Sequence, residues 1–299
     1  MLIRIGYDIE IESAGPVPLL MALSVHSSFD GRLIGEDRVR AQPAGEMPVH
    51  EYIDQFGNRI ARLTAPGGPL KLWSDCVVEI DGEADLQSPK AEQQDVQNLP
   101  DEVLRYLLPS RYCDSDNLVN AAWPLFSGYS TGWARVQAIS QFVHDHVTFG
   151  YQFGRANKTA SEVYREKTGV CRDFAHLTIS FCRAMNIPAR YASGYLGDIG
   201  VPYSGPGDFC AWLEVYLGGK WHTFDARYNV PRAGRVLMVR GTDAADVAMI
   251  TSFGDYKLTY FRVWTDEIDA LLSEPAILDM LKTRPVTEPL VFPTTAKVA

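Results

Sequence analysis

A pair of adjacent glycines in the C-terminal half constrains the fold of this chain more than any other feature. Gly218-Gly219 separates two runs rich in apolar residues, 211–217 and 220–226, and a two-residue glycine loop is typical of a β-hairpin. In this register the numbers of paired residues add up to 437, as those of the two glycines do. The pairing places Cys210, Trp212, Glu214, Asp225 and Arg227 on one face of the hairpin and His222 on the opposite face.

This cluster on one face of the hairpin has the composition of a site wall rather than of a core. Cys210 and Asp225 are diagonal neighbours in the predicted register, roughly 7–8 Å apart and within reach of each other's side chains. We expect Trp212 to line a cleft or pack in the core, and we expect Glu214 and Arg227 to pair as ions beside it.

The N-terminal third has the pattern of a β-sandwich. Isoleucines at 3, 5, 9 and 11 and Tyr7 alternate with polar residues or glycine, which predicts a strand with one buried face. Turn signals at 57–58 and 66–69 separate further short apolar runs. The sequence therefore predicts an antiparallel β-sandwich domain over residues 1–84.

A polar stretch from 85 to 100 precedes a change to helical periodicity. Helices are predicted at about 131–147, from near Ala160 and from Cys171 to Met185, with strands after them. We therefore expect an α+β chain with a core domain at 85–265. Residues 266–299 are expected to hold a short helix and a poorly ordered tail.

Composition excludes several classes of protein. The formal charge of −9 gives no basic surface for nucleic acid, so none is expected as a partner. No apolar stretch approaches the length of a membrane span, and five sparse cysteines favour free thiols in a reducing compartment. We expect a cytoplasmic protein with no cofactor and no metal, and its oligomeric state stays open.

Cys171 carries the strongest chemical signal. It follows Gly169-Val170 and opens a helix, where the positive end of the dipole favours a thiolate and unpaired N–H groups can bind an oxyanion. Cys182 returns to the same helix face about 16 Å further along the axis, too far to act with Cys171. We expect Cys182 to pack in the core.

No histidine is linked to this thiol by spacing. His176 lies on the wrong face of the helix, and His222 points away from the cluster on the hairpin. His144 and His146 stand two residues apart on a predicted helix, so they do not share a face for a metal.

Three separated stretches resemble the transglutaminase-like superfamily, and they occur in the family's order. The runs 168–177 (TGVCRDFAHL) and 186–195 (NIPARYASGY) resemble the thiol-bearing helix and the strand after it. The runs 209–216 (FCAWLEVY) and 221–226 (WHTFDA) resemble the segment with the family's histidine and aspartate. The Tyr-x-Asp-x-Phe-Gly-Asn pattern at 52–58 is similar to the β-rich N-terminal region of bacterial members.

The resemblance covers most of residues 1–265 and implies a β-sandwich followed by a papain-like core. It also implies thiol chemistry on amide bonds of peptides or proteins: a peptidase, an amidase or an acyl transferase. Cys171 matches the nucleophile and Asp225 the acid that orients the histidine. The histidine position, immediately before Ala211-Trp212, holds Cys210, whose pKa we expect the Asp225 carboxylate to raise.

Three hypotheses follow from this departure. The chain is a thiol enzyme in which Asp225, Glu214 or a water replaces the imidazole. Alternatively, it is an inactive member that binds peptides or a partner in the same cleft. In the third hypothesis Cys171 and Cys210 form a two-thiol site for a reversible disulfide or a soft metal.

Overall fold

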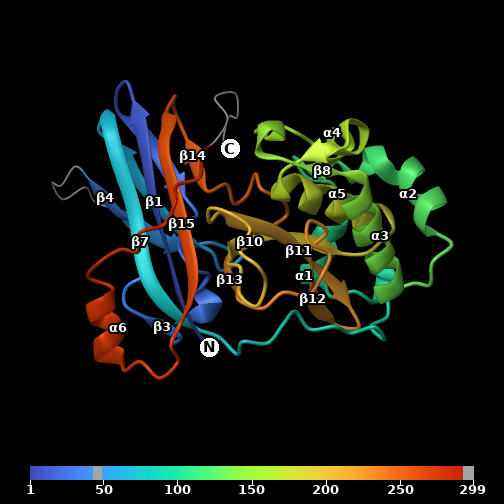
Figure 1. Cartoon of the computed structure of the whole chain (residues 1–299). Helices are drawn as coiled ribbons and strands as arrows, with labels where there is room; N and C mark the ends of the chain where they lie inside the picture. Colours follow the sequence, from blue (N-terminus) through green and yellow to red (C-terminus); the bar gives the residue numbers. More distant parts are fainter. Residues whose placement is uncertain (43–48, 292–299) are drawn as a thin grey trace.

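Two antiparallel sheets form a β-sandwich on one side of the molecule (Figure 1). The computed structural model describes residues 1–42 and 49–291. The first sheet has the order β15-β1-β7-β3, with β4 also on β7; its strands are β1 (Leu2–Ser13), β3 (Leu33–Ile34), β4 (Arg40–Gln42), β7 (Gly68–Glu79) and β15 (Lys257–Ile268). The second has the order β14-β2-β6-β5; its strands are β2 (Val17–Met21), β5 (His50–Ile53), β6 (Arg59–Ala65) and β14 (Ile250–Ser252).

The sandwich takes strands from both ends of the chain. β15 pairs with β1 along its whole length, for example Tyr7 with Val263, and β14 pairs with β2. The predicted boundary of the core domain at residue 265 therefore does not follow the sheets, because β14 and most of β15 fall inside 85–265. Local periodicity predicted a strand within β15 but not β14, and it carries no information about which distant strand a strand joins.

The polar face of β1 is also covered, unlike the half-exposed strand that the alternation predicts. Arg4 and Asp8 are buried, and Arg4 forms an ion pair of 2.6 Å with Asp75. Asp8 is bound by Arg262 and Arg284. The segment after β15 closes over this end of the sheet and carries the predicted C-terminal helix, α6 (Glu274–Met280). The end of the expected tail, residues 292–299, lies outside the described residues.

A third antiparallel sheet, β12-β11-β10-β13, lies between the sandwich and the helices (Figure 1). Its strands are β10 (Ala189–Leu196), β11 (Phe209–Leu217), β12 (Lys220–Phe224) and β13 (Arg235–Gly241). The predicted hairpin is confirmed: Leu213 pairs with Phe224 and Val215 with His222, and both loop glycines have positive φ. The faces of β11 and β12 are therefore those that the sequence predicts.

The helices pack on the side of this sheet away from the sandwich. They are α1 (Asp101–Leu104), α2 (Val119–Phe126), α3 (Trp133–His146), α4 (Ala160–Glu166) and α5 (Cys171–Ala184), with β8 (Thr148–Phe149) and β9 (Thr168–Gly169) as a small parallel pair. α5 contacts β10 and β11 as well as α3 and α4, and it is buried from Asp173 onward. The α+β class and the thiol-bearing helix packed on an antiparallel sheet are confirmed.

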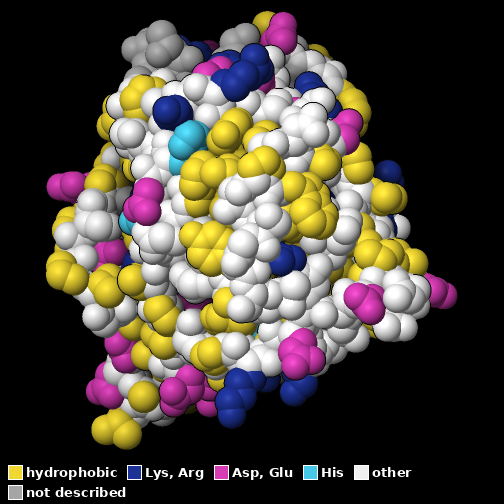
Figure 2. Space-filling model, turned by 90° about the vertical axis from the view of Figure 1, so that its right-hand side faces the viewer, with side chains coloured by type: hydrophobic (Ala, Val, Ile, Leu, Met, Phe, Trp, Pro, Cys, Tyr) yellow, Lys and Arg dark blue, Asp and Glu magenta, His cyan; other side chains and the backbone are white. Residues whose placement is uncertain are grey.

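The outer face of the helices has a mixed surface. Hydrophobic side chains gather near its middle, and most charged side chains lie toward its edges (Figure 2). No helix within 1–42 and 49–291 is long and apolar enough to cross a bilayer.

The turn before β6 fastens the sandwich to the third sheet. Asn58 is fully buried; its amide donates to the Arg240 carbonyl at 2.7 Å and accepts from the Arg240 N–H at 2.8 Å. Asp54 accepts from the same amide at 2.9 Å. The Tyr-x-Asp-x-Phe-Gly-Asn pattern therefore joins the two halves of the molecule, and these halves enclose the site described next.

Candidate functional site

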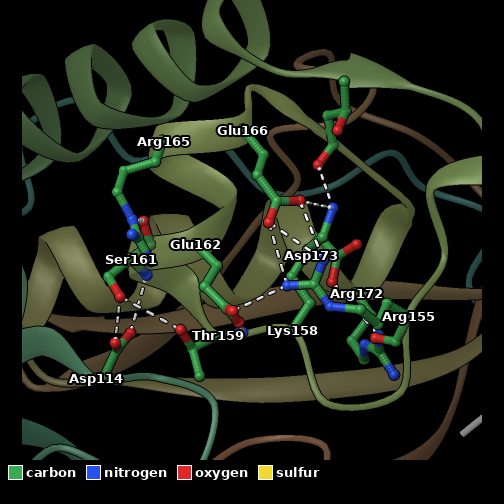
Figure 3. Close-up of polar contacts among 11 residues, drawn as sticks. Asp114, Arg155, Lys158, Thr159, Ser161, Glu162, Arg165, Glu166, Arg172 and Asp173 are labelled. Carbon is green, nitrogen blue, oxygen red and sulfur yellow. Dashed lines mark hydrogen bonds and ion pairs between the residues drawn. The ribbon is translucent and has the colours of Figure 1, made fainter.

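Cys171 is the first residue of α5, and the polar side chains around it fix where that helix begins. The Asp173 carboxylate accepts from the Val170 N–H at 2.9 Å and so caps the helix. Arg172 donates to the Arg155 carbonyl at 2.6 Å, and Arg155 itself is held by glutamates of α4 (Figure 3). The thiol is therefore presented from a helix start that is tied down on both sides.

The Cys171 thiol is half-buried and points toward β11. Its Sγ lies 3.9 Å from the Phe209 carbonyl oxygen. Burial raises the pKa of Cys171 to about 11, while the Arg227 guanidinium lowers it and the Asp208 carboxylate raises it further. The thiolate expected from the helix position is therefore not the resting form, because burial dominates. A base is needed to take the proton when the sulfur attacks.

Cys210 lies on β11 with its sulfur beside the same arginine. Arg227 Nη1 is 3.9 Å from Cys210 Sγ, and the thiol packs in a small apolar cluster with Trp212 and Leu237. Burial raises its pKa first, followed by the charges of Cys171, Asp208 and Asp225, with Arg227 opposing them. The predicted upward shift is confirmed, although Asp225 contributes less to it than burial does.

Arg227 links the two thiols. Its guanidinium lies 3.8 Å from the centroid of the Phe149 ring and 4.8 Å from that of Tyr228. It lowers the pKa of both Cys171 and Cys210. The expected ion pair of Arg227 with Glu214 is wrong. Arg227 turns toward the sulfurs because two aromatic rings hold it there.

Glu214 instead belongs to a separate ion cluster further along β11. It binds Arg190 at 2.6 Å and Arg240 at 2.8 Å. Trp212 packs with Cys210 and lies beneath the guanidinium of Arg235, 5.0 Å from its ring centroid. Trp212 is thus part of the wall behind Cys210, and the Glu214 carboxylate is fully engaged by its two arginines.

Asp225 supports the site through hydrogen bonds to its neighbours. Its Oδ2 forms an ion pair of 2.9 Å with Arg235, and its Oδ1 accepts from the backbone N–H of Arg227 at 3.0 Å. Arg235 also binds Asp85 of the linker. These bonds hold the backbone that carries Arg227, so Asp225 acts on the two thiols through the arginine.

A carboxylate that the sequence analysis did not select lies closer to the Cys171 thiol. Asp208 precedes Phe209 and accepts a hydrogen bond of 3.0 Å from the Tyr151 hydroxyl. Burial raises the pKa of Asp208 to about 6, and Tyr151 and Arg227 oppose this rise. Its place at the end of the glycine-rich loop, directly before a strand of the site, was the signal available in the sequence.

Two cavities meet at Asp208 and Tyr151, which line both of them. The first, of about 440 Å³, contains Cys171 and is called the thiol cavity below. The second, of about 770 Å³, contains Cys210 and Arg227 and is bordered by the loop 197–208. A glycine-rich loop therefore borders the site.

Within the described residues, the histidines that the sequence analysis considered do not contact either thiol. His176 is fully buried, accepts from the Ala244 N–H at 3.1 Å, and has its pKa lowered to about 3, chiefly by burial. His222 packs against Trp133 on the other face of the sheet, as predicted. His144 contacts the carbonyls of Ala226 and Arg227 rather than a sulfur.

The geometry gives no support to a metal at the thiols. In the part of the chain that the structure describes, no three His, Cys, Asp or Glu side chains converge in a manner suited to a metal ion. All five cysteines, each within that part, are free thiols.

The thiol lies at the start of a helix that packs on an antiparallel sheet, and later strands of that sheet supply the groups around it. This arrangement defines the class of this protein. Residues 121–226 match the family model of the transglutaminase-like superfamily, and this segment contains Cys171, Cys210 and Asp225. This segment of the chain is therefore similar to that superfamily.

Two relatives extend the likeness beyond the core. A putative cysteine protease of Cytophaga hutchinsonii is 29% identical, with a TM-score of 0.80 over 91% of this chain and 92% of that chain. The uncharacterized protein ML0607 of Mycobacterium leprae (strain TN) is 28% identical over 223 residues, 71% of this chain and 77% of that protein. The first match includes the sandwich, so sandwich and core occur together in a solved structure.

Proposed function

We propose that this protein is a thiol enzyme that acts on amide bonds of peptides or proteins, with Cys171 as the nucleophile. The observation that carries the proposal is the placement of one half-buried thiol at the start of α5, at the edge of a cavity and within the field of Arg227. The similarity to a putative cysteine protease supports this reaction class.

The proposed reaction begins with attack of Cys171 Sγ on the amide carbonyl. The first N–H groups of α5 have no acceptor within the helix and can bind the developing oxyanion. The C–N bond then breaks, the acyl group stays on sulfur as a thioester, and the amine leaves. Water or a second amine completes the cycle by attacking the thioester, which restores the thiol.

We assign the proton transfer to Asp208. Cys210 holds the histidine position, but burial raises its pKa. The thiol therefore keeps its own proton at neutral pH and cannot accept one from Cys171. Glu214 and Asp225 are engaged by arginines. Asp208 shares the thiol cavity with Cys171, and a pKa of about 6 lets it accept the thiol proton at neutral pH and return it to the leaving nitrogen.

In this mechanism Asp225 is a positioning residue for Arg227, and Cys210 is a neighbour that the arginine holds. Arg227 stabilises the Cys171 thiolate. This anion forms when the thiol loses its proton, and it forms again when the thioester is cleaved. The site therefore replaces the imidazole by a carboxyl group that transfers the proton and a guanidinium that stabilises the charge.

A thiol probe combined with an amide substrate tests the proposal. An iodoacetamide probe is expected to label Cys171 ahead of the four other cysteines, and Cys171→Ala is expected to lower amide turnover at least about 10³-fold. Cys182→Ala is the matched control, because that thiol is buried in the core. Turnover unaffected by Cys171→Ala refutes the proposal; tight peptide binding without any turnover favours a binding protein instead.

A reversible disulfide between Cys171 and Cys210 is the second candidate function. The Cys171 charge is among the causes that raise the Cys210 pKa, and the Arg227 guanidinium lowers the pKa of both thiols, which supports this candidate. With hydrogen peroxide as the oxidant, the two thiols lose their hydrogens, one S–S bond forms and two waters leave. Peptide mass spectrometry of the oxidised protein detects this link, and its absence after oxidation refutes the candidate.

A further inference from the structure

The thiol cavity is lined mainly by apolar side chains from both halves of the molecule. Its volume of about 440 Å³ lies in the usual range for small-molecule and side-chain pockets. The sandwich, β13 and the segment after β13 supply much of its apolar lining, which includes Ala22, Met238, Val247, Ala248, Met249 and Phe261. Because Cys171 lies at its edge, an apolar side chain bound in this cavity brings its own carbonyl close to the sulfur.

The charged residues that line the cavity are mostly cationic. Asp208 contributes the one carboxylate, whereas Arg111, Arg155 and Arg172 contribute three guanidinium groups. This balance is opposite to the net charge of the chain, which is −9.

Among the described residues, one of these three guanidinium groups has no carboxylate partner, and a second has a single long contact to one. Arg155 is bound by Glu162 at 2.9 Å and by Glu166 at 3.1 Å (Figure 3). Arg172 lies 3.5 Å from Asp173, and its buried Nε has no hydrogen-bond partner among the described residues. Arg111 has no ion pair within the described part of the chain.

The two guanidinium groups are held around one aromatic ring. The Cζ atoms of Arg111 and Arg172 lie 5.2 and 5.8 Å from the centroid of the Tyr112 ring. That ring stacks on His176 at 5.4 Å, and Asp243 accepts from the Tyr112 N–H at 2.6 Å. Two guanidinium groups therefore lie near one fixed ring, and each is a planar donor of the kind that binds a carboxylate.

We propose that the substrate is an acidic peptide: an apolar residue occupies the thiol cavity and donates the acyl group, and Arg111 and Arg172 bind the carboxylate of a neighbouring aspartate or glutamate. This inference rests on the proposed function and names the substrate class of the same site. The volume and lining of the cavity select the side chain. The guanidinium groups of Arg111, which has no ion pair among the described residues, and of Arg172, which has one long ion pair, select the charge.

Binding to the Cys171→Ala variant tests the inference without turnover. Three N-acetylated tripeptide amides, Glu-Leu-Gly, Gln-Leu-Gly and Glu-Gly-Gly, are titrated by calorimetry at low salt. The Glu-Leu peptide is expected to bind about tenfold more tightly than either of the others, because each control lacks one of the two contacts. Equal affinity for Glu-Leu and Gln-Leu overturns the carboxylate site, and equal affinity for Glu-Leu and Glu-Gly overturns the side-chain pocket.

Second substitutions in the same background assign the two contacts to residues. Arg111→Gln and Arg172→Gln are expected to remove most of the Glu-over-Gln preference, and Ala248→Phe is expected to remove the Leu-over-Gly preference. Arg111 is exposed, so its replacement leaves the fold intact even if Arg172→Gln does not. Arg165→Gln is the matched control, since Arg165 lies exposed on α4 and does not line the cavity.

The outcomes separate this inference from the proposed function. The order of affinities is measured in a variant that has no nucleophile, so it stands or falls whether or not the native protein turns over amides. The expected order of binding with no turnover in the native protein refutes the enzyme and keeps the binding site. Turnover of both acidic and neutral peptides at equal kcat/KM keeps the enzyme and refutes the substrate class.

Discussion

Cys171 and Cys210 lie beside the same arginine, yet their surroundings give them different capacities. Both have pKa values raised mainly by burial and lowered by Arg227. Cys171 begins a helix, is half-buried and opens onto the thiol cavity, whereas Cys210 is in mid-sheet, 5% exposed and packed against Trp212. The difference teaches that access and nearby N–H groups, rather than thiol acidity, distinguish the candidate nucleophile from its neighbour.

Among the groups around the two thiols, the largest effect is expected at Asp208, to which we assign the proton transfer from Cys171. Asp208→Asn is expected to lower amide turnover about 100-fold, because the leaving nitrogen loses its proton donor. Alkylation of Cys171 by iodoacetamide is expected to be at least as fast as in the native protein, because the Asp208 charge raises the Cys171 pKa. A structural role for Asp208 predicts instead that both rates fall together.

The pH dependence of kcat/KM is a second test of the role of Asp208. The reactive form has a thiol at Cys171 and a carboxylate at Asp208, whose pKa is about 6. kcat/KM is therefore expected to rise as the pH increases through about 6, where Asp208 loses its proton, and this rise is absent in Asp208→Asn. A rise centred elsewhere in the native protein contradicts the assignment.

A histidine at position 210 is expected to share the proton transfer that we assign to Asp208. Cys210→His places an imidazole where the family has its base, and turnover is expected to increase at least about tenfold. In this background Asp208→Asn is expected to cost much less than it does alone, because two groups then share the proton transfer. A double-mutant cycle measures this coupling, and strict additivity contradicts the idea of interchangeable proton carriers.

Removing the charge that both thiols share is expected to have a smaller effect. Arg227→Met keeps an unbranched stem against Phe149 and removes the guanidinium, so the pKa of Cys171 rises and its thiolate fraction falls at a fixed pH. Iodoacetamide alkylation of Cys171 at pH 8 is expected to slow about tenfold. Arg165→Met is the control, and an unchanged alkylation rate shows that Arg227 does not act on this sulfur.

The smallest effect is expected at the second thiol itself. Cys210→Ala is expected to change amide turnover by less than about threefold, and to lower the free energy of unfolding by about 1 kcal/mol through the lost packing against Trp212. Turnover assays and urea denaturation measure the two quantities. A loss of turnover as large as that of Cys171→Ala makes Cys210 catalytic and returns the site to a Cys-Cys-Asp arrangement.

Local patterns predicted the elements of the fold well and their long-range pairing poorly. The hairpin register was correct because a two-residue glycine loop leaves one pairing available. The expected boundary at 265 assigned β14 and most of β15 to the core domain rather than to the sandwich. The alternation of residues along a strand does not indicate which other strand it pairs with. The burial of Arg4 and Asp8 was missed for a similar reason: their partners come from distant parts of the chain.

The site was predicted in part. The predicted hairpin brought Cys210 and Arg227 together, although the paired register ends at Leu213 and Phe224 and Arg227 lies in the turn after β12. Asp208 and Tyr151 were missed because they lie on separate irregular segments, whose side-chain directions no periodicity predicts. Glu214 was assigned the wrong partner because Arg190 and Arg240 reach it from β10 and β13, two strands that the hairpin alone does not order.

The sequence by itself determined the α+β class, the helix that begins at Cys171 and the hairpin register. Each of these depends on residues close together in the chain or on a motif read in order. Only the tertiary structure decided which groups act on Cys171: burial that raises its pKa, an arginine held between two rings, and a carboxylate delivered by a loop. Those effects depend on distances between segments far apart in sequence, and only the packed chain sets these distances.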